Sequence, residues 1–113
     1  MISLKLDESK FRKLLNNMEN YPIKKQREVS RAVALSALSI ESEAKRIVPV
    51  RTGRLRSSIT AHITPARGEV GTNVSYAPTV EFGSAGRPPK PFLFPAWNQE
   101  RPKFIASLKV IFK

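Results

Sequence analysis

Residues Val48–Ile59 read VPVRTGRLRSSI, and they separate a long helical pattern from a half of the chain that is rich in strand patterns. Pro49 has no backbone N–H and its ring clashes with the preceding turn, so a helix is expected to end there. Thr52 can cap a new element by accepting backbone hydrogen bonds, and Gly53 tolerates backbone angles that other residues avoid. The stretch therefore turns the chain and starts its second half. Three of its side chains are expected to point away from the core, those of Arg51, Arg54 and Arg56.

Helical patterns fill the part of the chain before this stretch. Residues 22–48 are expected to form one helix, and about 25 helical residues would be about 38 Å long at 1.5 Å per residue. A helix of this length either lies across its own sheet or extends into contacts with other subunits. Glu41 and Lys45 have the spacing of an ion pair on a helix surface. A shorter helix is expected over residues 8–20, with Asp7 as its N-cap. The apolar face of the long helix consists of Val29, Val33, Ile40, Ala44 and Ile47, widened by Ala32, Ala37 and Leu38.

Strand patterns dominate after the stretch. Residues 58–74 alternate apolar and polar side chains on either side of the turn residues 65–68, which predicts a β-hairpin. Residues 2–6 alternate in the same way and predict a short edge strand. These patterns predict an α+β fold, in which a long central helix packs on a small antiparallel sheet with an N-terminal and a C-terminal helix. We expect one domain over residues 1–113.

The last third of the chain contains most of the prolines and aromatic residues. Residues 84–91 are expected to form a stiff basic loop, and residues 102–112 a terminal helix with Pro102 near its first position. Between the two lies Phe92–Trp97, which either docks the terminal helix on the sheet or anchors another subunit.

A short helix is expected to precede the basic loop and to end at Gly83. In this helix Val80 and Phe82 are expected to pack against the core. Glu81 lies between them, so we expect it to be buried and paired with an arginine such as Arg54 or Arg56.

The composition excludes several classes of protein. The chain carries 20 Lys and Arg against 9 Asp and Glu, a net charge of +11, and it has no cysteine. The charge indicates a polyanionic or acidic partner, or else a solvated surface. The absence of cysteine excludes disulfides and thiol catalysis and favours a reducing compartment. No apolar run approaches the roughly 20 residues of a membrane span, and we expect a soluble protein made in the cytosol.

Enzymatic motifs are missing. The sequence contains no paired histidines, no phosphate-binding glycine loop, and none of the H-E-x-x-H or G-x-S-x-G patterns. The single histidine, His62, is expected to lie on a strand surface. We therefore predict a protein that is not an enzyme, with no catalytic residue, metal or cofactor.

Three blocks of sequence carry a resemblance to a known family. They are Val48–Ile59, Gly71–Gly83 (GTNVSYAPTVEFG) and Pro91–Ala96 (PFLFPA), and they span the chain from about Ala32 to Trp97. In this order and spacing they resemble the small tail-completion, or neck, proteins of long-tailed bacteriophages, the "gene product ten-like" tail-component family.

The resemblance implies a structural virion protein, made in the bacterial host cytoplasm, at the head-tail junction. Such a protein helps to complete the tail and to join it to the head connector, within ring-shaped assemblies around the DNA path. The implied partners are connector or neck proteins, tail-tube or tail-terminator proteins, other copies of the chain, and DNA in the channel, with no membrane.

From the resemblance and the charge pattern together, we expect cations to meet acidic surfaces or DNA phosphates, and aromatic side chains to hold the basic loop. The alternative is a small basic nucleic-acid-binding module, whose affinity falls steeply with salt. The residues expected to contact partners are Arg51, Arg54, Arg56, Arg87, Lys90, Phe92, Phe94 and Trp97.

Overall fold

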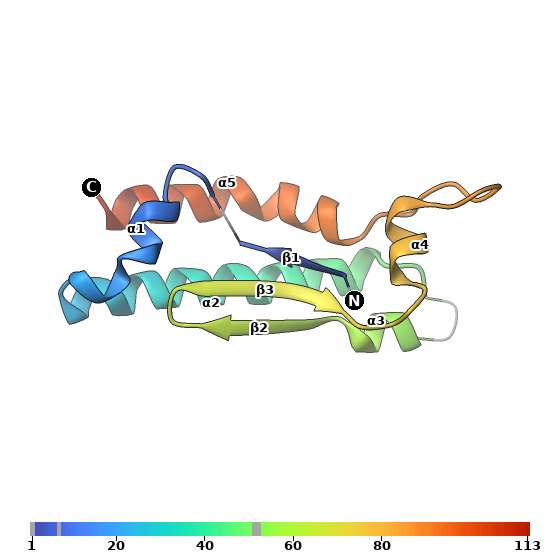
Figure 1. Ribbon diagram of the computed structural model, residues 1–113, viewed down its shortest axis with the longest axis horizontal. Helices are drawn as coiled ribbons and strands as arrows, with labels where there is room; N and C mark the ends of the chain where they lie inside the picture. The colour runs from blue at the N-terminus through green and yellow to red at the C-terminus, as the bar shows by residue number, and fades with distance from the viewer. Residues whose placement is uncertain (1, 7, 51–52) are drawn as a thin grey trace.

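The computed structural model describes residues 2–6, 8–50 and 53–113, so the expected caps Asp7 and Thr52 and the candidate site residue Arg51 lie outside the described residues. The molecule is elongated, with principal extents of 51 × 21 × 20 Å (Figure 1). Its elements in chain order are β1 (Ile2–Lys5), α1 (Arg12–Asn16), the 3-10 helix η1 (Met18–Asn20), α2 (Ile23–Ile47), α3 (Arg54–Ser58), β2 (Thr60–Thr64), β3 (Arg67–Thr72), α4 (Ala77–Phe82) and α5 (Leu93–Ile111).

The sheet has three antiparallel strands in the order β1-β3-β2. The expected edge strand is β1, and the expected hairpin is β2 and β3, joined by a turn that is tighter than residues 65–68 because Thr64 already pairs with Arg67. Gly71 of β3 lies directly against β1. A Cβ atom there would lie 2.4 Å from the carbonyl oxygen of Ile2, so this close approach of two strands requires glycine.

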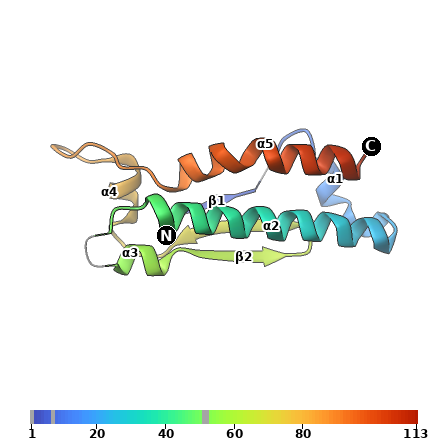
Figure 2. The same ribbon diagram turned by 180° about the vertical axis from the view of Figure 1, so that it is seen from behind.

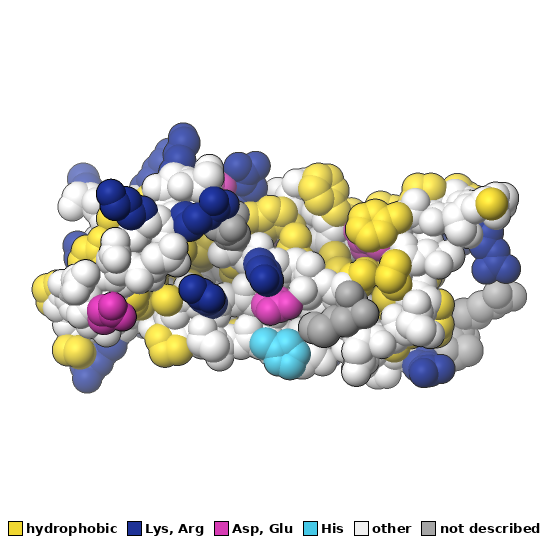
Figure 3. Space-filling model, in the orientation of Figure 1, with side chains coloured by type: hydrophobic (Ala, Val, Ile, Leu, Met, Phe, Trp, Pro, Cys, Tyr) yellow, Lys and Arg dark blue, Asp and Glu magenta, His cyan; other side chains and the backbone are white. Residues whose placement is uncertain are grey.

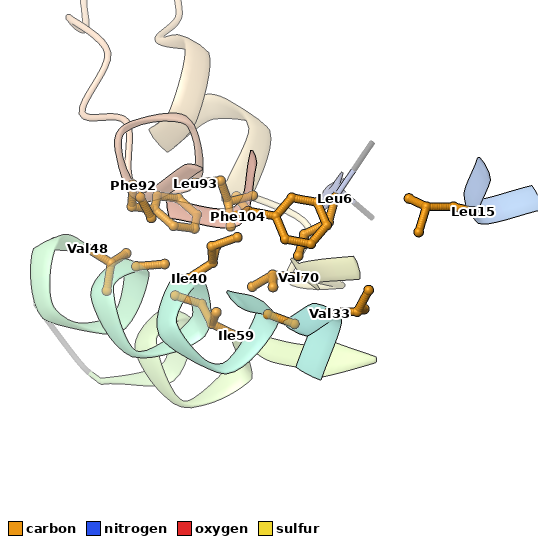
Figure 4. Packing of buried hydrophobic residues seen from close by; sticks show 14 of the residues in the cluster. Leu6, Leu15, Val33, Ile40, Val48, Ile59, Val70, Phe92, Leu93 and Phe104 are labelled. Carbon is orange, nitrogen blue, oxygen red and sulfur yellow. The ribbon is translucent and has the colours of Figure 1, made fainter. Parts of the chain in front are cut away.

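Two long helices form the rest of the body. α2 packs against one face of the sheet, and α5 runs antiparallel to α2 along its side, so the sheet keeps one uncovered face (Figures 1 and 2). The core lies where these layers meet. Figure 4 shows Phe104 of α5, Ile40 of α2, Val70 of β3 and Leu6 converging on this region, and all four are buried. This architecture confirms the α+β fold expected from the sequence.

The long helix has the expected apolar face, with one exception. Val29, Val33, Ile40 and Ala44 are buried as the spacing predicts. The prediction that Leu38 widens this face is wrong, because 51% of its surface is exposed. Leu38 instead forms part of the outer side of α2, which neither the sheet nor α5 covers.

Side chains of α2 also hold the hairpin in place. Glu41 accepts a hydrogen bond from the backbone N–H of Ala61 on β2, and it pairs with Lys45 at 3.8 Å, as predicted. The hydroxyl of Ser30 donates to the carbonyl of Pro65 in the hairpin turn, at 2.7 Å. Because β2 is an edge strand, the bond from Ala61 also occupies a backbone N–H that would otherwise be open to another strand.

The N-terminal helix expected over residues 8–20 is shorter and broken. Residues 8–11 form a turn, because the side chain of Glu8 points inward, where it is buried and forms an ion pair with Arg101 at 3.0 Å. Asn17 then leaves the helical conformation (φ −103°, ψ 28°) and separates α1 from η1. Asparagine favours such interruptions because its side chain competes for backbone hydrogen bonds.

The terminal helix begins at Leu93, not at residue 102 as predicted, and the reason is a buried carboxylate. Glu81 of α4 accepts hydrogen bonds from the backbone N–H groups of Phe92 and Leu93 at 3.0 Å and of Phe94 at 3.2 Å. Glu81 is buried as expected, but among the described residues these N–H groups hold its carboxylate and no ion pair with an arginine side chain is found. Pro102 lies inside α5, on its exposed side.

A third buried acid, after Glu8 and Glu81, lies in the seam between α2 and α5. Glu100 is only 9% exposed, and its Oε2 has no hydrogen-bond partner among the described residues. Burial raises the pKa of Glu100, while the charge of Lys103 and a hydrogen bond with Ser39 act in the opposite direction. The ionised form of Glu100 is therefore disfavoured in the folded protein.

Replacing Gly71 with alanine should destabilise the sheet. The added Cβ would meet backbone atoms of β1, which must move away, and we expect a loss of about 1–3 kcal/mol, typical of overpacking. Gly68→Ala is the matched control, because its nearest neighbours at 3.3 Å are side-chain atoms of Ala37 and Val33. Thermal unfolding and amide hydrogen exchange of β1 measure the effect. Equal losses in the two variants would contradict this explanation.

Replacing Glu81 with alanine should unfold the start of α5. Three backbone donors would lose a charged acceptor, at a cost of about 2–3 kcal/mol. Chemical denaturation gives the magnitude, and hydrogen exchange at Phe92–Phe94 locates it. Glu19→Ala removes the same charge from an exposed position and should cost little. Unchanged protection of these three amides in Glu81→Ala would show that the carboxylate does not hold the helix start.

Replacing Glu100 with glutamine should stabilise the protein at neutral pH. An acid whose pKa is raised on folding makes the protein less stable as the pH rises above its unfolded pKa, because the unfolded state then releases the proton first. We expect Glu100→Gln to have a higher Tm than the wild type at pH 7 and the same Tm at pH 3. Glu43→Gln, which removes a half-buried carboxylate bound to Arg46, should give no such gain. A lower Tm for Glu100→Gln at pH 7 would refute the argument.

Candidate functional site

The basic loop projects from one end of the molecule, beyond α4 (Figure 1). We call this end, made of α3, α4 and residues 84–91, the loop end. All eight loop residues are exposed, yet the loop is held in shape. Ser84 and Arg87 exchange two backbone hydrogen bonds across a turn in which Gly86 has φ 78°. The N–H of Lys90 donates to the carbonyl of Val80 at 2.8 Å.

A cleft of about 460 Å³ lies at the loop end, between α3, α4 and the loop. Tyr76, Val80 and Pro88 give it apolar surface, and Arg87 and Lys90 also line it. Arg54 of α3 lies beside the cleft, with its guanidinium carbon 6.0 Å from the ring centroid of Tyr76, within cation–π range. The loop end therefore combines an aromatic and proline-lined hollow with several positive charges.

The candidate site residues fall into three groups. Arg54, Arg87 and Lys90 come together around the cleft, and Arg56 is exposed on the same short helix as Arg54. Phe92 is fully buried and belongs to the core, so it is not available to a partner in this conformation.

The two other aromatic candidates lie on the first turns of α5. Phe94 is 59% exposed. Trp97 is half-buried and packs its ring against that of Phe104, with centroids 6.3 Å apart. The aromatic segment is thus divided between core and surface.

Two exposed aromatic residues of the loop end were not among the candidates. Phe82 was expected to pack against the core, but it is 73% exposed at the end of α4, and Tyr76 is exposed beside the cleft. Figure 3 shows hydrophobic side chains gathered where α4 meets the start of α5. The spacing of Phe82 within a short helix could not show which side faces solvent, because a six-residue helix has too few turns to define one face.

The described residues contain no cluster of metal-ligating side chains. Among them, no three His, Cys, Asp or Glu side chains lie close enough together to hold a metal ion. His62 lies on the exposed side of β2, where it pairs in register with Glu69 of β3. No helix in the described part of the chain has the length and apolar character to span a membrane.

Polar contacts join the three sequence blocks to one another. Ser58 of the first block and Thr72 of the second share a hydrogen bond of 2.6 Å between their hydroxyl groups. Glu81 of the second block binds the backbone of Phe92–Phe94 in the third. The blocks, far apart in the chain, thus form one continuous structure at the loop end.

Comparison with known proteins identifies a family. A family model described as "Bacteriophage HK97-gp10, putative tail-component" matches residues 12–83, which include the first two sequence blocks and end before the third. No curated protein and no solved structure was found to match the chain.

The matched region contains α2, the hairpin, α3 and α4, and so includes Glu81, but it ends before the basic loop of residues 84–91. It covers well over half of the chain, and the chain belongs to the bacteriophage HK97-gp10 family of tail components.

Proposed function

We propose that this tail component completes the phage tail and joins it to the head connector, and that it docks through the loop end. The observation that carries the proposal is the convergence of Arg54, Arg87 and Lys90 around the Tyr76 cleft on an end of the molecule that Glu81 holds in shape. The partner is a connector, neck, tail-tube or tail-terminator protein with an acidic surface.

The chemistry of the loop end suits a protein partner. Aromatic and arginine side chains are the commonest anchors of protein interfaces. Exposed Phe82 at the end of α4 and exposed Phe94 at the start of α5 supply further apolar surface, and the cations of the cleft steer an acidic partner into place. Because the loop is tied by backbone hydrogen bonds, little conformational entropy is lost when it binds.

The outer side of α2 suits contacts between copies of the chain. Leu35 and Leu38 are 57% and 51% exposed there, on the helix that spans most of the molecule. We propose that several copies form a ring in the virion, with these leucines at the contacts, after synthesis in the host cytoplasm.

Deleting the gene from its phage tests the joining role directly. Electron microscopy of the lysate should show filled heads lying apart from tails. Intact, infectious virions in the deletion lysate would exclude a role in joining.

Charge reversal in the basic loop should reproduce the loss of joined particles that we expect from deleting the gene. In a phage carrying Arg87→Glu and Lys90→Glu, we expect the number of joined particles to fall by at least tenfold, because two cations of the cleft become repulsive toward an acidic partner. Lys24→Glu with Arg27→Glu is the matched control. It makes the same change in net charge on exposed positions in the first turns of α2, where acidic residues favour the helix dipole.

Counting joined particles by electron microscopy and titrating infectivity give the result. Normal assembly with the loop variant, or equal losses with both variants, would contradict docking through the loop end. Circular dichroism of the purified variants confirms that both fold.

A further inference from the structure

We propose that the opposite end of the molecule carries a second binding site, which holds the phosphate backbone of double-stranded DNA. The site is a cleft of about 450 Å³ between α1 and the uncovered face of the sheet, which we call the α1 cleft. Lys5 of β1, Arg12 of α1 and Arg67 of β3 line it, so three different elements contribute a cation.

The surroundings of the α1 cleft are strongly positive. Over residues 1–31 and 101–113, Lys and Arg outnumber Asp and Glu by twelve to four. Apart from β1, most of these residues belong to α1, the start of α2 and the second half of α5, which meet at this end of the molecule (Figure 1). Figure 3 shows Lys and Arg side chains gathered over it, on the same face of the molecule as the cleft.

Glu69 is the one acid among the described residues that line the α1 cleft, and its neighbours balance its charge. Glu69 is paired in strand register with Lys5 on one side and with His62 on the other. Its negative charge therefore lies within a row that also holds a cation, and Arg12 and Arg67 add to the positive charge of the cleft. The ion pair of buried Glu8 with Arg101 neutralises one of the four acids together with one of the twelve cations, which leaves eleven cations against three acids.

The lining of the α1 cleft favours a phosphate backbone over an acidic protein. Protein interfaces depend on exposed aromatic or large apolar anchors. The large apolar side chains that line this cleft, Leu6 and Leu15, are 6% and 7% exposed and form its floor. What remains accessible is arginine, lysine and polar groups, the side chains that contact phosphates in protein–DNA complexes. The loop end, in contrast, exposes the aromatic side chains of Tyr76 and Phe82.

The lining also favours a duplex over a single strand. Proteins that bind single-stranded nucleic acid stack its bases on aromatic side chains. No aromatic ring other than the imidazole of His62 lines the α1 cleft among the described residues. Contacts to phosphates alone carry no sequence information, so we expect binding that is independent of DNA sequence.

Fluorescence anisotropy with the purified full chain and a 20-base-pair duplex of random sequence tests the proposal. We expect binding at 50 mM salt that weakens steeply toward 200 mM. The double variant Lys5→Gln with Arg67→Gln should lower the slope of log affinity against log salt by about 2, because each lost phosphate contact removes about 0.9. The conservative pair Lys5→Arg with Arg67→Lys should retain the wild-type slope.

Arg87→Gln with Lys90→Gln is the matched control, because it removes the same charge from the loop end. This loop-end variant should leave DNA binding nearly unchanged. No binding at 50 mM salt would overturn the proposal, and so would equal losses in the two glutamine variants. If polyglutamate of matched charge competes as effectively as unlabelled DNA, the proposal is also overturned, and an acidic protein is then the favoured partner.

Discussion

The start of α5 depends on one buried carboxylate. The first four N–H groups of any helix lack partners within the helix. In α5, three of the N–H groups at this end, those of Phe92, Leu93 and Phe94, donate to Glu81, and the next residue, Pro95, has no N–H to satisfy. Burying a carboxylate costs several kcal/mol, and here the three charge-assisted hydrogen bonds and the positive end of the helix dipole offset that cost.

The same interaction determines where the basic loop goes. Glu81 lies in α4 and its partners lie at the start of α5, so the chain between them must leave and return to nearly the same place. The backbone bond from Lys90 to Val80 closes the base of this excursion. The loop is therefore projected outward, and its cations are exposed because its ends are fixed.

The contacts between sequence blocks explain why motifs so far apart form one pattern. Ser58 bonds Thr72, and Thr72 in turn accepts a hydrogen bond from the N–H of Val74 as the chain leaves β3 for α4. Replacing Thr72 with a residue that has no hydroxyl would remove the acceptor of the buried Val74 N–H, and an unsatisfied buried donor costs more than the bond itself contributes.

Periodicity was sufficient to predict the long helix and the hairpin, because both bury one face over many residues. It could not predict the start of α5. Pro95 and Pro102 argue locally against a helix there, and the group that overrides them is a carboxylate more than ten residues earlier in the chain. Nor could it separate Phe92 from Phe94, since which of two residues so close in the chain faces the core depends on where the helix begins.

Once the fold is known, the net charge of the chain no longer indicates a single kind of partner. From composition alone, a protein partner and a nucleic acid are equally good explanations of +11. The fold divides the cations between two ends of a molecule 51 Å long, and it surrounds them differently. At the loop end they lie beside exposed aromatic rings, whereas in the α1 cleft the large apolar side chains are buried beneath them. Because the antiparallel pair of α2 and α5 connects the two ends through a continuous core, their separation is fixed. Two partners of different chemistry could then be held at a constant distance, which a flexible basic tail could not achieve.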